Sequence, residues 1–215
     1  VERNCGYGGI IGSVRAISNV LIEGCQNTGN VSSARTSGGY ATFGGGILGA
    51  YGTFGLGWDA KESAELNIIN CMNGGSVSGY NNTAGILGST MEIALANAEI
   101  NIESCSNFGD VESIKDVAGG IMARTAEGVD GVTLNVKSCL NAGSVKSGSG
   151  DMGAHAAGIL GNAQGRFTVV IDSCVNFGEI YANRWESSGI IGQINDDRCA
   201  DFRFVKNCVN LGSVT

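Results

Sequence analysis

The chain contains no proline, a single histidine and no long apolar run. Without proline, every backbone N–H is able to donate a hydrogen bond, which suits a protein built mainly from strands. No apolar stretch approaches the ~18 residues that a membrane-spanning helix needs, so we expect no membrane span. The chain carries 13 basic and 20 acidic residues, and no basic stripe is present to neutralise phosphates. This charge balance argues against nucleic acid as a partner.

The usual signatures of metal and cofactor sites are also missing. One histidine, His155, and the absence of a C-x-x-C pair are incompatible with an ordinary zinc site. The pattern G-x-G-x-x-G occurs at 44–49 and 148–153, but no helix is predicted to follow either match, as a dinucleotide site requires. We therefore expect no cofactor and no metal.

A motif, C-x-N-x-G-x-[VI], recurs along the whole chain. Its cysteines are separated by 46, 34, 34, 35 and 34 residues. A period this regular is typical of a solenoid, in which each repeat packs on its neighbours. The repeated residues are Cys25, Cys71, Cys105, Cys139, Cys174 and Cys208, with Asn27, Asn73, Asn107, Asn141, Asn176 and Asn210 two positions later.

Each repeat contains three strand-like segments. The first surrounds a glycine-flanked apolar pair such as Gly45–Gly49, the second precedes the cysteine with period-2 alternation, and the third is centred on a valine or isoleucine. The sequence therefore predicts an all-β, right-handed parallel β-helix of about six three-stranded rungs, forming a single domain over residues 1–215. In the last copy Arg203 stands at an inward position, and we expect a one-residue bulge there.

The repeated cysteines and asparagines have structural roles in this prediction. Neighbours in a stacked column lie ~4.8 Å apart, which does not suit a disulfide, so we expect buried, unbridged thiols. The remaining cysteines, Cys5 and Cys199, lie outside the column. Asparagine tolerates the left-handed backbone of a sharp corner, so we expect Asn and Gly to form that corner. Stacked amides are also expected to hydrogen-bond along the axis as a structural ladder.

The glycine-flanked pair followed by I-x-x-C-x-N-x-G-x-V resembles the GLUG repeat of bacterial secreted and surface proteins. That repeat occurs in the non-catalytic region of M26-type IgA-specific metallopeptidases and in gut-bacterial adhesin-like proteins. The resemblance spans about six units and implies an extracellular or cell-surface β-solenoid. It implies nothing catalytic, since H-E-x-x-H is absent.

The longest insertion, Ala50–Glu65, is the candidate binding segment. It carries Tyr51, Phe54, Trp58 and Asp59, a mixture suited to stacking on sugar rings or anchoring a protein. The competing interpretation is that these aromatic side chains fold back onto the solenoid.

Two functional hypotheses follow. The first is a non-catalytic, adhesin-like or spacer module that binds a glycan or a host or bacterial surface protein, with neighbouring domains in a longer chain. The alternative is a polysaccharide lyase or glycosidase, which requires paired carboxylates in one groove. The outward column Glu23, Ile69, Glu103, Lys137, Asp172, Lys206 mixes charges and favours the first hypothesis.

Overall fold

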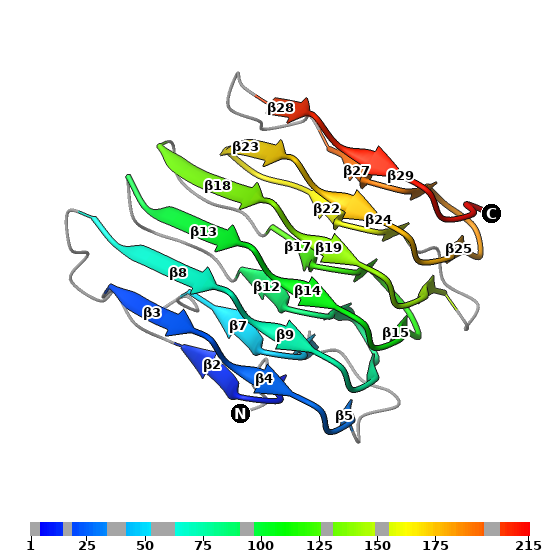
Figure 1. The fold of residues 1–215 in the computed structure, drawn as a ribbon, viewed down its shortest axis with the longest axis horizontal. Helices are drawn as coiled ribbons and strands as arrows, with labels where there is room; N and C mark the ends of the chain where they lie inside the picture. The colour runs from blue at the N-terminus through cyan, green and yellow to red at the C-terminus, as the bar shows by residue number, and fades with distance from the viewer. Residues whose placement is uncertain are drawn as a thin grey trace.

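The protein is a stack of short parallel strands (Figure 1). The computed structural model describes residues 5–14, 19–33, 42–52, 63–90, 97–125, 131–148, 155–195 and 203–215. Every regular element within those ranges is a β-strand. The chain ascends by one turn per repeat, so its two ends lie at opposite ends of the stack. The predicted all-β parallel solenoid is confirmed.

Five parallel sheets run along the axis, four with six strands and one with five. Sheet A contains β1 (Cys5–Gly8), β6 (Thr42–Gly45), β11 (Asn82–Ala84), β16 (Ala118–Gly119), β21 (Ala156–Ala157) and β26 (Ser187–Ser188). Sheet B contains β2 (Ile11–Val14), β7 (Leu48–Tyr51), β12 (Leu87–Thr90), β17 (Met122–Arg124), β22 (Leu160–Ala163) and β27 (Ile191–Ile194). Sheet C contains β3 (Val20–Glu23), β8 (Glu65–Ile69), β13 (Glu99–Glu103), β18 (Val132–Lys137), β23 (Phe167–Asp172) and β28 (Arg203–Lys206).

The last two sheets follow the cysteine motif. Sheet D contains β4 (Gln26–Asn27), β9 (Met72–Asn73), β14 (Ser106–Asn107), β19 (Leu140–Asn141), β24 (Val175–Asn176) and β29 (Val209–Asn210). Sheet E contains β5 (Val31–Ser32), β10 (Val77–Gly79), β15 (Val111–Ser113), β20 (Val145–Ser147) and β25 (Ile180–Ala182). In the last turn a single bridge from Val214 to Ile180 takes the place of a sixth strand.

Each predicted three-strand repeat is therefore divided into five strands, because two of its segments bend. The cysteine segment bends at the residue before the cysteine. That position has a positive φ in all six copies, at Gly24, Asn70, Ser104, Ser138, Ser173 and Asn207. The expectation that the motif asparagine and glycine form a left-handed corner after the cysteine is wrong. Asn141 and its equivalents lie in strands of sheet D, and neither they nor the motif glycines have a positive φ. The left-handed residue turns the chain so that the asparagine points inward.

The main core lies between sheets B and C and includes the cysteine column. Its side chains form columns in register along the axis. Fully buried examples are Ile68, Ile102 and Val136 from sheet C and Leu48, Leu87 and Met122 from sheet B. At the last turn the predicted bulge is absent, because Arg203–Lys206 pairs residue for residue with Val169–Asp172.

The cysteine column is confirmed in its four central turns, where Cys71, Cys105, Cys139 and Cys174 are buried, unbridged thiols. Cys25 and Cys208, at the two ends of the column, are unbridged but only half-buried, because no further turn covers them. Cys105 Sγ donates to the carbonyl oxygens of Ile68 and Glu103, both at 3.3 Å. The hydrogen bond with Cys105 and burial both raise the pKa of Cys71, and burial raises the pKa of Cys208. Cys71 and Cys208 therefore stay protonated.

Candidate functional site

The segment predicted to bind a ligand is only partly within the described residues. Tyr51 belongs to β7 and is 2% exposed, packed in the main core, where burial raises the pKa of its hydroxyl. It therefore follows the competing interpretation and folds onto the solenoid. Phe54, Trp58 and Asp59 lie outside the described residues.

The asparagine ladder is confirmed and is structural. Asn107 Nδ2 donates to Asn141 Oδ1 at 2.8 Å, and Asn141 Nδ2 donates to Asn176 Oδ1 at 2.7 Å. The second proton of each amide goes to a glycine carbonyl of its own turn, as from Asn141 to Gly143 at 2.9 Å. The same hydrogen bonds join all six asparagines, Asn27 through Asn210. Both protons of the amides from Asn27 to Asn176 are thus committed to the ladder and to their own turns.

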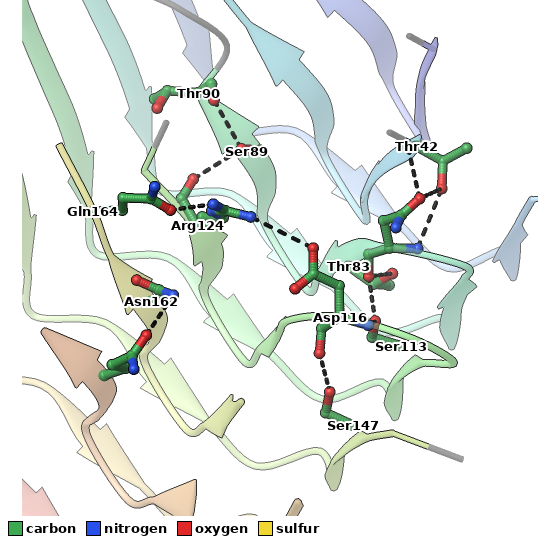
Figure 2. Close-up of polar contacts among 12 residues, drawn as sticks. Thr42, Thr83, Ser89, Thr90, Ser113, Asp116, Arg124, Ser147, Asn162 and Gln164 are labelled. Carbon is green, nitrogen blue, oxygen red and sulfur yellow. Dashed lines mark hydrogen bonds and ion pairs between the residues drawn. The ribbon is translucent and has the colours of Figure 1, made fainter. Parts of the chain in front are cut away.

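A different cluster of polar side chains is formed by the connections from sheet E to sheet A together with the ends of the strands in sheet B. Ala84 and Val117 from the sheet A side pack against Ala123 from sheet B, which closes the angle between the two sheets. Around this contact lie Ser89, Asp116, Arg124, Asn162 and Gln164, five of the side chains drawn in Figure 2. We call this set, with His155, Trp185 and Glu186, the polar corner.

Arg124 is the centre of the polar corner. Its Nη1 lies 3.5 Å from Oδ2 of Asp116, and its Nη2 donates to Gln164 Oε1 (Figure 2). The Arg124 backbone is fixed as well, since its carbonyl accepts a hydrogen bond from Ser89 Oγ at 3.0 Å. Both side chains of the ion pair are half-buried, at 27% and 29% exposed. The guanidinium charge is therefore neutralised inside the corner.

Several atoms of the polar corner have no hydrogen-bond partner among the described residues. Oδ1 of Asn162 is one, although Asn162 is 4% exposed and its Nδ2 donates to Gln193 at 3.0 Å. Nε of Arg124 is another, as is Oδ1 of the neighbouring Asn82 in β11. Buried polar atoms are nearly always paired with protein, water or a ligand. These atoms are enclosed within the corner and lie away from its surface.

His155 lies at the end of the polar corner nearest the C-terminus. It is 3% exposed, and its Nδ1 is 2.7 Å from Oε2 of Glu186. Its ring is 4.9 Å from the ring of Trp185, centre to centre, with the planes tilted by 46°. Burial lowers the pKa of His155, and the Glu186 carboxylate partly offsets that effect. The imidazole is thus held mainly neutral beside an aromatic ring.

The sequence analysis missed this cluster. It treated His155 only as a failed zinc ligand and did not single out Asp116, Arg124 or Trp185. These residues are far apart in sequence, and the repeat landmark does not mark them because they stand at positions that vary. The available signal was register: aligning the copies on their glycine pairs puts His155 and Glu186 at the same position of successive turns.

A second surface feature is a row of exposed residues that follows sheet D. The residue after each motif asparagine is exposed in all six turns, at Thr28, Gly74, Phe108, Ala142, Phe177 and Leu211. Phe108 and Phe177 are 51% and 53% exposed, and each is followed two residues later by an exposed acid, Asp110 or Glu179. Because Asn107, Asn141 and Asn176 pair in register, the two rings stand two turns apart, about 9.6 Å. We call this row the aromatic stripe.

The outer face of sheet C carries mixed charges, as predicted for its main column. Lys137 lies 3.6 Å from Glu103, and Lys206 lies 3.2 Å from Asp172. This face also holds one column in which acids occupy adjacent turns, since Glu99 pairs in register with Glu65. This column was overlooked because its acids stand at the first residue of their strands, and in some other turns the strand begins only after that position.

Comparison with known proteins adds no identification. No protein-family model matches the chain, and neither a curated protein nor a solved structure matches it. The described residues contain no helix suited to crossing a membrane. Nor do three or more His, Cys, Asp or Glu side chains gather there as a metal-binding group. The function is therefore argued from the two surface features.

Proposed function

We propose that this protein is a non-catalytic repeat module of a bacterial surface or secreted protein, whose solenoid presents a binding face to a glycan. The GLUG-like repeat supports this proposal, and so does the assignment of the repeated cysteines and asparagines to packing and ladders. The observation that carries it is the aromatic stripe, where Phe108 and Phe177 occupy equivalent positions two turns apart and are exposed.

The chemistry of the stripe suits an extended sugar chain. The apolar face of a sugar ring stacks on an aromatic side chain, and its hydroxyls bond to nearby carboxylates. Phe108 with Asp110 and Phe177 with Glu179 repeat this pair, while the turn between them carries Ala142 and Ser144. Asp110 already accepts from Ser144 Oγ at 2.7 Å, which fixes its carboxylate beside the stripe. Two turns match the length of a disaccharide unit in an extended chain.

A glycan array with wild type, Phe108→Ala and Phe177→Ala tests the proposal. Each substitution is expected to weaken binding about tenfold, the effect of removing one interface aromatic worth ~1.4 kcal/mol. Phe204→Ala is the matched control, because Phe204 is 51% exposed on sheet C, away from the stripe. The double variant Phe177→Ala with Ala142→Phe shortens the ring spacing to one turn and should change which glycans bind.

Unchanged glycan binding in both phenylalanine variants would overturn the assignment to the stripe. If a surface protein binds instead of any glycan, and the same two variants lose that binding, the stripe remains the binding face and its partner is a protein.

A carbohydrate-active enzyme is the second candidate, favoured by one observation. Asp116 and Glu186 both act electrostatically on His155 within the polar corner, where Arg124 is also present. Two carboxylates in one site are the minimum for glycoside hydrolysis. A polysaccharide degradation screen with wild type, Asp116→Asn and Glu186→Gln tests it. Turnover that both substitutions abolish would replace the non-catalytic proposal.

A further inference from the structure

Trp185 is an exposed aromatic residue with an unusually well-fixed environment. Its side chain is 58% exposed, yet its ring lies 4.9 Å from that of His155, which is 3% exposed. Large aromatic side chains are usually buried for most of their surface, so a tryptophan left this exposed on a rigid base is a candidate ligand contact.

The base beneath the ring is part of the sheet. The carbonyl of His155 accepts a hydrogen bond from Ala118 N at 2.9 Å, and Ala156 N donates to the Glu186 carbonyl at 3.0 Å. Trp185 immediately precedes Glu186, and β26 starts one residue later. The ring is therefore attached to backbone that is hydrogen-bonded to the preceding turn, which limits the entropy that a ligand must remove on binding.

A carboxylate lies beside the base of the ring. The Glu186 side chain is 52% exposed, and its Oε2 is 2.7 Å from Nδ1 of His155. A carboxylate only accepts hydrogen bonds, so it suits a hydroxyl of a molecule stacked on the indole.

The charges favour a neutral ligand. Arg124 is already paired with Asp116, and the exposed Arg184 and Glu186 on either side of Trp185 carry opposite charges. The surface next to the ring therefore has no net charge that would select an anion. A sugar ring without charge satisfies the hydroxyl partners and the aromatic surface together.

We propose that Trp185, with His155 beneath it and Glu186 beside it, forms a second binding site that takes a neutral sugar residue. The sugar stacks on the indole and donates a hydroxyl to the Glu186 carboxylate. This site is separate from the aromatic stripe, since it lies where sheets A and E meet and shares no residue with sheet D. It does not depend on the stripe binding a glycan.

Tryptophan fluorescence tests the site, because the chain has two tryptophans, Trp58 and Trp185. In a Trp58→Phe background, Trp185 alone reports, and the probes are cellohexaose, xylohexaose, mannohexaose and the anionic oligogalacturonate. A saturable change in emission with a neutral oligomer is expected. In calorimetry, Trp185→Ala should lose at least tenfold in affinity, Trp185→Phe less, and Glu186→Gln several-fold.

Two controls separate this proposal from the proposed function. Phe108→Ala and Phe177→Ala should leave the Trp185 signal unchanged, even where they abolish binding on the array. Thermal melts of Trp185→Ala establish that the variant remains folded. The site is overturned if no neutral oligomer changes Trp185 emission at millimolar concentration, if Trp185→Ala keeps wild-type affinity, or if only the anionic oligomer binds.

Discussion

Gly120 lies flat against the side-chain amide of Asn141, at the same level of the solenoid. A β-carbon on Gly120 would overlap Cγ of Asn141 and the carbonyl oxygen of Gly158 in the next turn. The second residue of each landmark, always glycine, has the same relationship to the motif asparagine of its turn, from Gly9 with Asn27 to Gly189 with Asn210. The two halves of the repeat motif are therefore one packing unit, in which glycine makes room for the ladder.

Gly120→Ala is expected to destabilise the protein by about 3 kcal/mol or more, at the upper end of the range for overpacking. The overlapping atoms belong to a backbone carbonyl and to an amide bonded on both sides, so neither can move cheaply. Gly74→Ala is the matched control, because its β-carbon would meet only one atom, Asn27 O at 3.8 Å. Urea unfolding measures both, and equal stabilities in the two variants would contradict the packing unit.

Replacement of a central ladder residue should break hydrogen bonds in two directions. Asn141→Ala removes the acceptor of Asn107 Nδ2 and the donor to Asn176 Oδ1, leaving both amides buried and partly unsatisfied. A loss of roughly 2–4 kcal/mol is expected, since each unsatisfied buried group costs ~1–3 kcal/mol. Asn101→Ala provides the comparison: its similar ladder on the outer face of sheet C, to Asn67 and Asn135, is only half-buried. A larger effect at Asn101 would be inconsistent with this account.

The sequence was sufficient to predict the fold because the repeat constrains every turn in the same way. Period, alternation and the C-x-N-x-G motif each indicate a column, and columns of cysteine, asparagine and isoleucine are present as predicted. The corner was misplaced because the residue with positive φ varies among glycine, asparagine and serine, so it leaves no constant letter in the motif.

The candidate sites were harder to predict for a physical reason. A ligand contact is a departure from the repeat, and the sequence does not distinguish a functional departure from a tolerated one. His155, Trp185 and Arg124 come together only because three turns stack in register and sheets A and B meet at an angle. Phe108 and Phe177 were visible in the motif, but their exposure depends on which way sheet D faces.

The thiol column makes a prediction about reactivity. With a disulfide-exchange reagent, the half-buried Cys25 and Cys208 should react in native protein, whereas Cys71, Cys105, Cys139 and Cys174 should react only after unfolding. Burial keeps these four thiols out of reach of the reagent. Comparison with a Cys25→Ser, Cys208→Ser variant assigns the native reaction of the two end thiols, and Cys105→Ser should leave it unchanged. A native reaction that Cys105→Ser reduces, or oxidised column thiols in denatured, non-reduced protein, would argue against a buried, unbridged column.

His155 should give the protein a distinct dependence of stability on pH. Its pKa is lowered by burial, against partial opposition from Glu186 and Asp116, with Arg124 acting in the same direction as burial. The unfolded chain, with a histidine pKa near ~6.5, then binds the proton first as the pH falls. The free energy of unfolding therefore decreases from about pH 7 downward, until the pH passes the lower pKa of the folded state.

Because His155 is the only histidine, His155→Gln should flatten the stability curve between about pH 7 and 5, while carboxylate titrations remain common to both proteins. Parallel curves for wild type and His155→Gln, measured by urea unfolding at each pH, would mean that the imidazole is not held neutral beside Trp185.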